Sequence, residues 1–158
     1  AMPPWRLRQL LPRATLQAIE AAIGASERTH GGQICFAVET ALDVAPLVRG
    51  EAARERALEV FAQLRVWDTE HNNGVLIYLL LADRAVEIVA DRGLNLQVDA
   101  AAWRMLAAGM AEAFRAGRFE EGLAAAVDRV DALLRRHYAL ADGERNPNEL
   151  PDQPVVIA

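Results

Sequence analysis

The polar residues between positions 68 and 74 hold the densest set of chemically useful groups in this sequence. Asp68, Glu70, His71, Asn72 and Asn73 offer carboxylate, imidazole and amide groups within six positions, directly before a run of seven apolar residues. Carboxylate and amide oxygens are hard ligands of the kind that Ca²⁺ and Mg²⁺ prefer. A histidine is the side chain best suited to acid–base work near neutral pH. The loop therefore indicates a cation site or a small catalytic centre.

A second polar loop, which begins at Asp91 and Arg92, is expected beside the first. It leaves the hairpin that the Asn73-Gly74 turn enters, and in an antiparallel pair the start of one strand and the end of the next share one end of the sheet. Asp99, which begins the following helix, is expected at this end too. A guanidinium can hold a phosphate or carboxylate with two parallel hydrogen bonds.

These residues define the predicted site. We expect a Ca²⁺ or Mg²⁺ ion to be its cofactor, if it has one, and a metal-assisted hydrolysis would use this ion to polarise a phosphoryl oxygen. The metal ligands would be Asp68, Asp91 and Asp99, the ligand-binding residues Asn72, Asn73 and Arg92, and the catalytic candidates Asp68, His71 and Arg92.

A purely structural interpretation accounts for the same residues. Asn, Asp and Gly form turns, and Asn73-Gly74 before a strand would supply a backbone position with positive φ. Asp99 is explained by helix capping. Arg92 would pair with Asp91 or Glu87, and a single histidine in an exposed loop is solvated.

Other catalytic patterns are missing from the sequence. There is no phosphate-binding glycine loop, no zinc-protease helix motif and no nucleophile elbow. The three histidines, at 30, 71 and 137, are scattered, which argues against a zinc site. Ser26, the only serine, lies near a predicted helix end and is a poor nucleophile candidate, and Cys35 is expected to be a small buried side chain in an apolar run.

Hydrophobic periodicity predicts the elements that position these loops. Helical spacing marks 12–25 and 51–65, continuous apolar runs mark strands at 34–38 and 75–81, and a short turn joins the latter to a strand at 85–90. Two helices follow, with apolar stripes from Trp103 to Phe114 and from Phe119 to Tyr138. The order α-β-α-β-β-α-α predicts a single-domain α/β fold, an α/β/α sandwich with a small mixed sheet.

Composition limits the partners and the location. The net charge of −5 argues against non-specific binding of nucleic acid. No apolar run approaches the 18 or more residues that a membrane span needs, and no signal peptide is recognisable. The chain as given is therefore expected to be cytoplasmic, on the assumption that nothing upstream was removed. The proline-containing tail, 141–158, is expected to lie extended and offers a contact for a protein partner.

The chain resembles the TPM domain family in the order and spacing of several motifs. These are the polar loop that ends in Asn73-Gly74, the apolar strand after it, the return strand that ends near Gly93, and the joint from Phe114 to Phe119. The resemblance divides the chain into an N-terminal helical segment (1–33), a TPM-like core (34–140) and the tail.

The resemblance implies an α/β/α sandwich, and relatives in chloroplasts and bacteria are linked to acid phosphatase activity and to calcium binding. Because no dedicated nucleophile stands out, a non-catalytic accessory protein that binds a metal or a partner is the expected function. A weak metal-assisted acid phosphatase is the alternative.

Overall fold

The computed structural model describes residues 9–42, 49–141 and 143–157. Residues 1–8 of the predicted N-terminal segment lie outside this part of the chain. The described strands form one four-stranded sheet with the order β3-β2-β1-β4. The strands are β1 (Gln33–Glu39), β2 (Gly74–Leu80), β3 (Ala85–Ala90) and β4 (Val155–Ile157). Strand β1 is parallel to β2 and to β4, whereas β2 and β3 form the predicted antiparallel hairpin.

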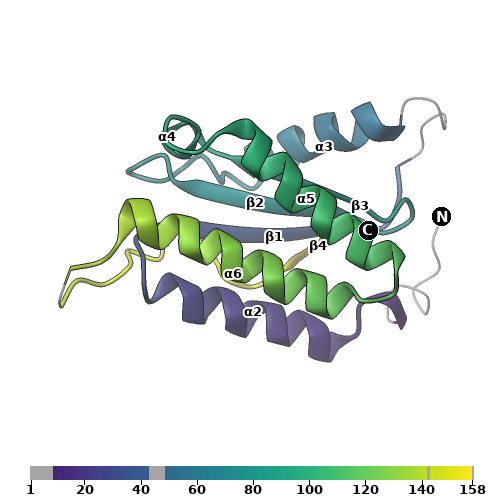
Figure 1. Ribbon diagram of the computed structural model, residues 1–158, viewed down its shortest axis with the longest axis horizontal. Coiled ribbons are helices and arrows are strands. Elements are labelled where there is room, and N and C mark those ends of the chain that lie inside the picture. The colour runs from purple at the N-terminus through teal and green to yellow at the C-terminus, as the bar shows by residue number, and fades with distance from the viewer. Residues whose placement is uncertain (1–8, 43–48, 142, 158) are drawn as a thin grey trace.

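Helices cover both faces of this sheet, so the predicted fold class is confirmed (Figure 1). Three long helices lie side by side on one face: α2 (Arg13–Glu27), α5 (Ala100–Arg115) and α6 (Phe119–Tyr138). Helix α3 (Arg49–Gln63) lies on the other face, against β2 and β3. The sequence predicts a loop after β3, whereas the structure has the short helix α4 (Arg92–Asn95) there.

Alternating strand residues divide the core into two layers. On β2, Val75, Ile77 and Leu79 pack toward α2, α5 and α6, whereas Leu76 and Tyr78 pack toward the α3 side. Every residue of β1 and β2 is buried, as expected for parallel strands that are covered on both faces. The predicted apolar stripes of α5 and α6 form much of the first layer.

The tail is part of the sheet. Val155 of β4 pairs with Ala37 of β1, so the tail adds an edge strand to its own domain. Before that strand, Asn146 donates to the backbone oxygens of His30 and Gly32, and Leu150 is 6 % exposed. The extended tail that the sequence predicts is therefore packed along the domain.

Close backbone contacts hold the Asn-Gly loop to the start of α4. The amide of Gly93 donates to Asn72 O at 2.9 Å, and the amide of Asp91 donates to Gly74 O at 2.9 Å. A Cβ atom at Gly93 would lie 2.5 Å from His71 O and 2.6 Å from Asn72 O. Glycine is required here because the two backbones approach too closely for a side chain.

Gly74 has the same role, which corrects one prediction. A Cβ at Gly74 would lie 2.2 Å from Val66 O. The positive φ of this loop, 51°, belongs to Asn72, and neither Asn73 nor Gly74 has one. Gly74 is therefore needed for a close approach and not for a left-handed backbone.

Replacing Gly93 with alanine should destabilise the domain by roughly 1–3 kcal/mol, because the new methyl group overpacks two backbone oxygens. Gly109→Ala is the matched control, since Gly109 lies in α5 with no atom within 4 Å of the added Cβ. That variant should gain about 0.5–1 kcal/mol, the usual benefit of alanine over glycine in a helix. Urea unfolding of both variants measures the difference, and equal stabilities would contradict the close-contact account.

Ending the chain after Ala139 should lower the free energy of unfolding by roughly 3 kcal/mol. The truncation exposes the site of Leu150 and leaves the buried Gln33 side chain without its partners in the tail. A chain that ends at Gln153 lacks only β4 and should lose less. Urea unfolding tests both, and an unchanged stability after the longer truncation would show that the tail is not part of the folded domain.

Candidate functional site

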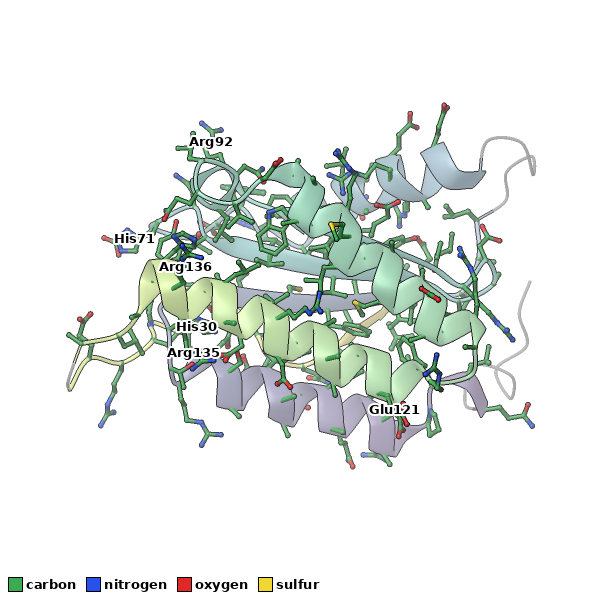
Figure 2. All side chains as sticks on the ribbon, viewed as in Figure 1. His30, His71, Arg92, Glu121, Arg135 and Arg136 are labelled. Carbon is green, nitrogen blue, oxygen red and sulfur yellow. The ribbon has the colours of Figure 1, made fainter. Side chains whose placement is uncertain are left out.

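The Asn-Gly loop and the loop that begins at Asp91 lie together, as predicted, at the amino ends of β1 and β2. The backbone bonds of Asp91 and Gly93 join the β3–α4 connection to the Asn-Gly loop, and the amide of Gln33 at the start of β1 donates to Asn73 O at 3.3 Å. Figure 2 shows His30, His71 and Arg92 at this end of the molecule, opposite Glu121. In open α/β sheets ligands usually bind at the carboxyl ends of the strands, so this candidate site lies at the less usual end.

The structure does not gather the three predicted metal ligands. Among the described residues, no group of three or more His, Cys, Asp or Glu side chains is placed to hold a metal ion. Asp68 is exposed and pairs with Arg65 at 2.9 Å. Asp99 caps α5 by accepting a hydrogen bond from the amide of Ala101 at 3.2 Å, as the structural interpretation predicts. Asp91 is therefore the predicted ligand that remains of interest.

Two buried oxygens at this end of the sheet have no hydrogen-bond donor among the described residues. Asp91 uses Oδ1 to accept from the amide of Arg92, while its Oδ2 is buried without a donor. Asn73 is fully buried and donates from Nδ2 to Gly31 O at 3.1 Å, while its Oδ1 likewise lacks a donor. An unsatisfied buried acceptor costs about 1–3 kcal/mol, so both atoms indicate an unfilled requirement for a cation or a donor.

The hydroxyl group of Tyr138 lies within the electrostatic influence of Asp91. Its hydroxyl lies 3.2 Å from Nε2 of Gln97, which donates to it. Burial raises the pKa of Tyr138, the hydrogen bond from Gln97 opposes this rise, and the negative charge of Asp91 adds to it. Asp91 itself is partly buried and has no cationic partner among the described ion pairs.

The other predicted residues lie on the surface of the same end. Asn72, His71 and Arg92 are exposed. Glu87, offered as a partner for Arg92, instead lies 3.6 Å from Arg54. His71 and Arg92 are accessible to a ligand, but no described side chain orients them, so they are not arranged as a catalytic pair.

Sequence reasoning missed a serine–histidine–aspartate cluster. Ser26 Oγ lies 2.9 Å from His30 Nε2 and donates to Asp131 Oδ1 at 2.6 Å, and Arg135 holds the other oxygen of that aspartate at 2.8 Å. Asp131 and Arg135 lie on one face of α6, whereas His30 follows the end of α2, four residues after Ser26. Only the packing of α2 against α6 brings the two pairs together.

The direction of the hydrogen bonds shows that this cluster is not a nucleophilic triad. His30 Nδ1 accepts from the amide of Gly32, and burial lowers the pKa of His30, so the neutral ring carries its proton on Nε2. That nitrogen donates to Ser26, which donates in turn to Asp131. A catalytic serine must give its proton to the histidine, whereas here the histidine gives a hydrogen bond to the serine.

The carboxyl end of the sheet contains a buried ion pair that needs no ligand. Glu39 is 6 % exposed and accepts from Tyr78 Oη at 2.7 Å and from Arg56 Nε at 2.8 Å. A second nitrogen of Arg56 reaches the other oxygen at 3.2 Å, in a two-point contact. Burial, followed by the bond to Glu39, raises the pKa of Tyr78. These groups satisfy one another, so they stabilise the α3 layer without indicating a binding site.

Comparisons with known proteins agree with this architecture. The structure of the BA42 protein from the psychrophilic bacterium Bizionia argentinensis is 25 % identical, with a TM-score of 0.76, and the match covers 91 % of this chain and 93 % of that one. The N-terminal domain of a protein from P. gingivalis is 21 % identical, with a TM-score of 0.66, over 84 % of this chain and 82 % of the other. The second likeness shows the fold alone. Comparison with curated protein sequences gives no match.

No helix within the described residues is both long and apolar enough to cross a membrane. The sequence profile of the TPM domain matches residues 6–133, which is most of the chain. This chain therefore belongs to the TPM domain family.

Proposed function

We propose that this TPM-domain protein is a non-catalytic accessory protein that binds a divalent cation, Ca²⁺ or Mg²⁺, at the amino end of its sheet. The observation that supports the proposal is the pair of buried oxygens, Asp91 Oδ2 and Asn73 Oδ1, that lack donors. A carboxylate and an amide oxygen are the ligand types that both ions take, and exposed backbone oxygens and water complete such shells.

The chemistry of the surrounding groups favours binding over catalysis. Phosphoryl transfer needs a nucleophile or base that is positioned against the substrate. His71 and Arg92 are exposed and unoriented, and the Ser26–His30–Asp131 cluster has its hydrogen bonds in the wrong direction for attack. A partner protein that supplies an acidic or carbonyl group to the bound ion would suit an accessory role.

A weak metal-assisted phosphatase, as the family resemblance implies, is the alternative. The exposed guanidinium of Arg92, the residue that follows Asp91, is the feature that favours it, because it could hold a phosphate beside the cation. The two functions share the cation and differ in turnover, so one set of variants tests both.

Thermal unfolding with Ca²⁺ and with Mg²⁺ tests the cation site. At about one hundred times the dissociation constant, a bound ion stabilises the folded state by about 2.7 kcal/mol, which raises the melting temperature by several degrees. We expect this rise in the wild type and its loss in Asp91→Asn, since asparagine still caps α4 but lacks the charge.

Two controls separate Asp91 from the other predicted ligands. Asp99→Asn makes the same change at the cap of α5, and Asp68→Ala removes an exposed carboxylate. Both should keep the full rise. The absence of any rise in the wild type would overturn the cation site, and its loss in Asp68→Ala would move the site to the exposed part of the loop.

Hydrolysis of p-nitrophenyl phosphate, followed with and without the two cations between pH 5 and 8, separates the two functions. We expect no turnover above the buffer rate in the wild type, because no group is positioned to activate water or to form a covalent intermediate. Cation-dependent turnover that disappears in both Arg92→Ala and Asp91→Asn would establish the phosphatase in place of the accessory role.

A further inference from the structure

A second pair of buried carboxyl oxygens lies between α2 and the tail, away from the Asn-Gly loop. Glu27, in the last turn of α2, is 4 % exposed, and its Oε2 accepts from the amide of Ile34 at 2.9 Å. Its Oε1 and the Oδ1 of Asp152 are both buried, and apart from a proton shared between the two carboxyl groups neither has a donor among the described residues. Asp152 lies in the tail, three residues before β4.

These two carboxyl groups contact each other, so one of them must carry a proton in the absence of another cation. Burial raises the pKa of Glu27 to about 9, and its hydrogen bond with Asp152 is the second cause. The amide of Ile34 acts in the opposite direction. At neutral pH the pair therefore holds one shared proton and one negative charge, like other carboxyl pairs that cannot both ionise.

A polar cavity of about 390 Å³ opens beside this pair. Arg28 and Arg145 line it, and neither forms an ion pair with a described carboxylate. Arg28 uses only Nε, which donates to Gly24 O at 3.3 Å. The cavity thus presents a carboxyl pair deep in its wall and two available guanidinium groups nearer to solvent. Its remaining lining residues are Gly24, Glu144, Asn146 and Asn148.

We propose that this cavity binds a free α-amino acid, whose ammonium group replaces the shared proton between Glu27 and Asp152 and whose carboxylate is held by Arg28 and Arg145. The ligand carries an ammonium and a carboxylate group on one carbon atom, and the cavity lining contains both carboxyl and guanidinium groups. On binding, the ammonium donates hydrogen bonds to both carboxylates, and the displaced proton leaves to solvent.

The volume of the cavity and the charges of its lining residues favour an amino acid over a metal ion as the ligand. A water molecule takes up about 30 Å³ in the liquid, so the cavity has room for a ligand of several heavy atoms. The two guanidinium groups in the lining, Arg28 and Arg145, repel a metal ion and attract the carboxylate of an amino acid. The ammonium group of the same ligand needs only two or three acceptors.

The charged and titratable groups around Glu27 determine how binding depends on pH. Asp152 faces it from the tail, Cys35 from β1, Arg28 from its own helix, and Glu144 and Arg145 from the segment before Asn146. Because the pKa of Glu27 is raised from 4.5 to about 9 on folding, the contribution of this carboxyl group to the stability of the empty protein should be complete below pH 4.5. That contribution should be lost as the pH rises toward 9. Bound ligand should reduce this loss.

Isothermal titration calorimetry at pH 7.5 tests the site, with glycine, L-alanine, L-serine, L-glutamate and L-lysine as probes. Two buffers of different ionisation enthalpy, neither of which contains a primary amine, reveal proton transfer. We expect at least one amino acid to bind the wild type with release of about one proton. Glu27→Gln should fold, since its amide accepts from Ile34 and donates to Asp152, but should weaken binding at least tenfold. Asp152→Asn should behave in the same way.

Matched controls distinguish this site from general effects of charge. Glu144→Gln makes the same change in a second glutamate of the cavity lining. The carboxylate of Glu144 accepts only from the nearby amide of Ala141, so this variant should bind the amino acid within twofold of the wild type. Propionate, which lacks the ammonium, should not compete with L-alanine. The proposal is wrong if no probe binds the wild type, if Glu27→Gln binds as tightly as the wild type, or if propionate competes. The cation site is tested at Asp91, so either proposal can fail alone.

Discussion

The burial of β1 and β2 on both faces is the constraint on which the rest of this structure depends. Two adjacent parallel strands without an exposed residue require helices on each side. They also leave two polar side chains of β1, Gln33 at its start and Glu39 at its end, in a setting where each must find partners inside the protein. How these two residues are satisfied explains much of the remaining architecture.

At the amino end of β1, the side chain of Gln33 forms hydrogen bonds with the tail. Its amide nitrogen donates to Asn146, and its oxygen accepts from the amide of Leu150. These contacts bring Asp152 against Glu27 and align β4 beside β1. At the carboxyl end, Glu39 is satisfied by Tyr78 and Arg56, which fixes α3 on the sheet. One end is therefore closed by an internal ion pair, while the other is built from loops and the tail.

The hydrogen-bond partners of a polar group distinguish structural residues from candidate binding residues more clearly than residue type does. The Ser26–His30–Asp131 cluster has the composition of a catalytic triad, yet each of its polar atoms has a partner in an order that holds α2 to α6. Glu27 and Asp152 look ordinary in sequence, yet each has a buried oxygen that no N–H group of the described residues satisfies, as do Asp91 and Asn73. Because an unsatisfied buried acceptor is costly, a cation or a ligand bound at these four residues would stabilise the protein.

The sequence by itself determined the local elements and one piece of site geometry. Continuous apolar runs identified β1 to β3, helical stripes identified α5 and α6, and the hairpin placed Asp91 beside the Asn-Gly loop. These features depend on periodicity and short connections, which are visible in a single chain. Only the tertiary structure decided that Asp68, Asp91 and Asp99 do not form one metal-binding group, that the tail pairs with β1, and that Glu27 meets Asp152. The physical reason is that such contacts join residues of distant segments, and they form only because burial of the sheet forces each polar group to find a partner across the fold.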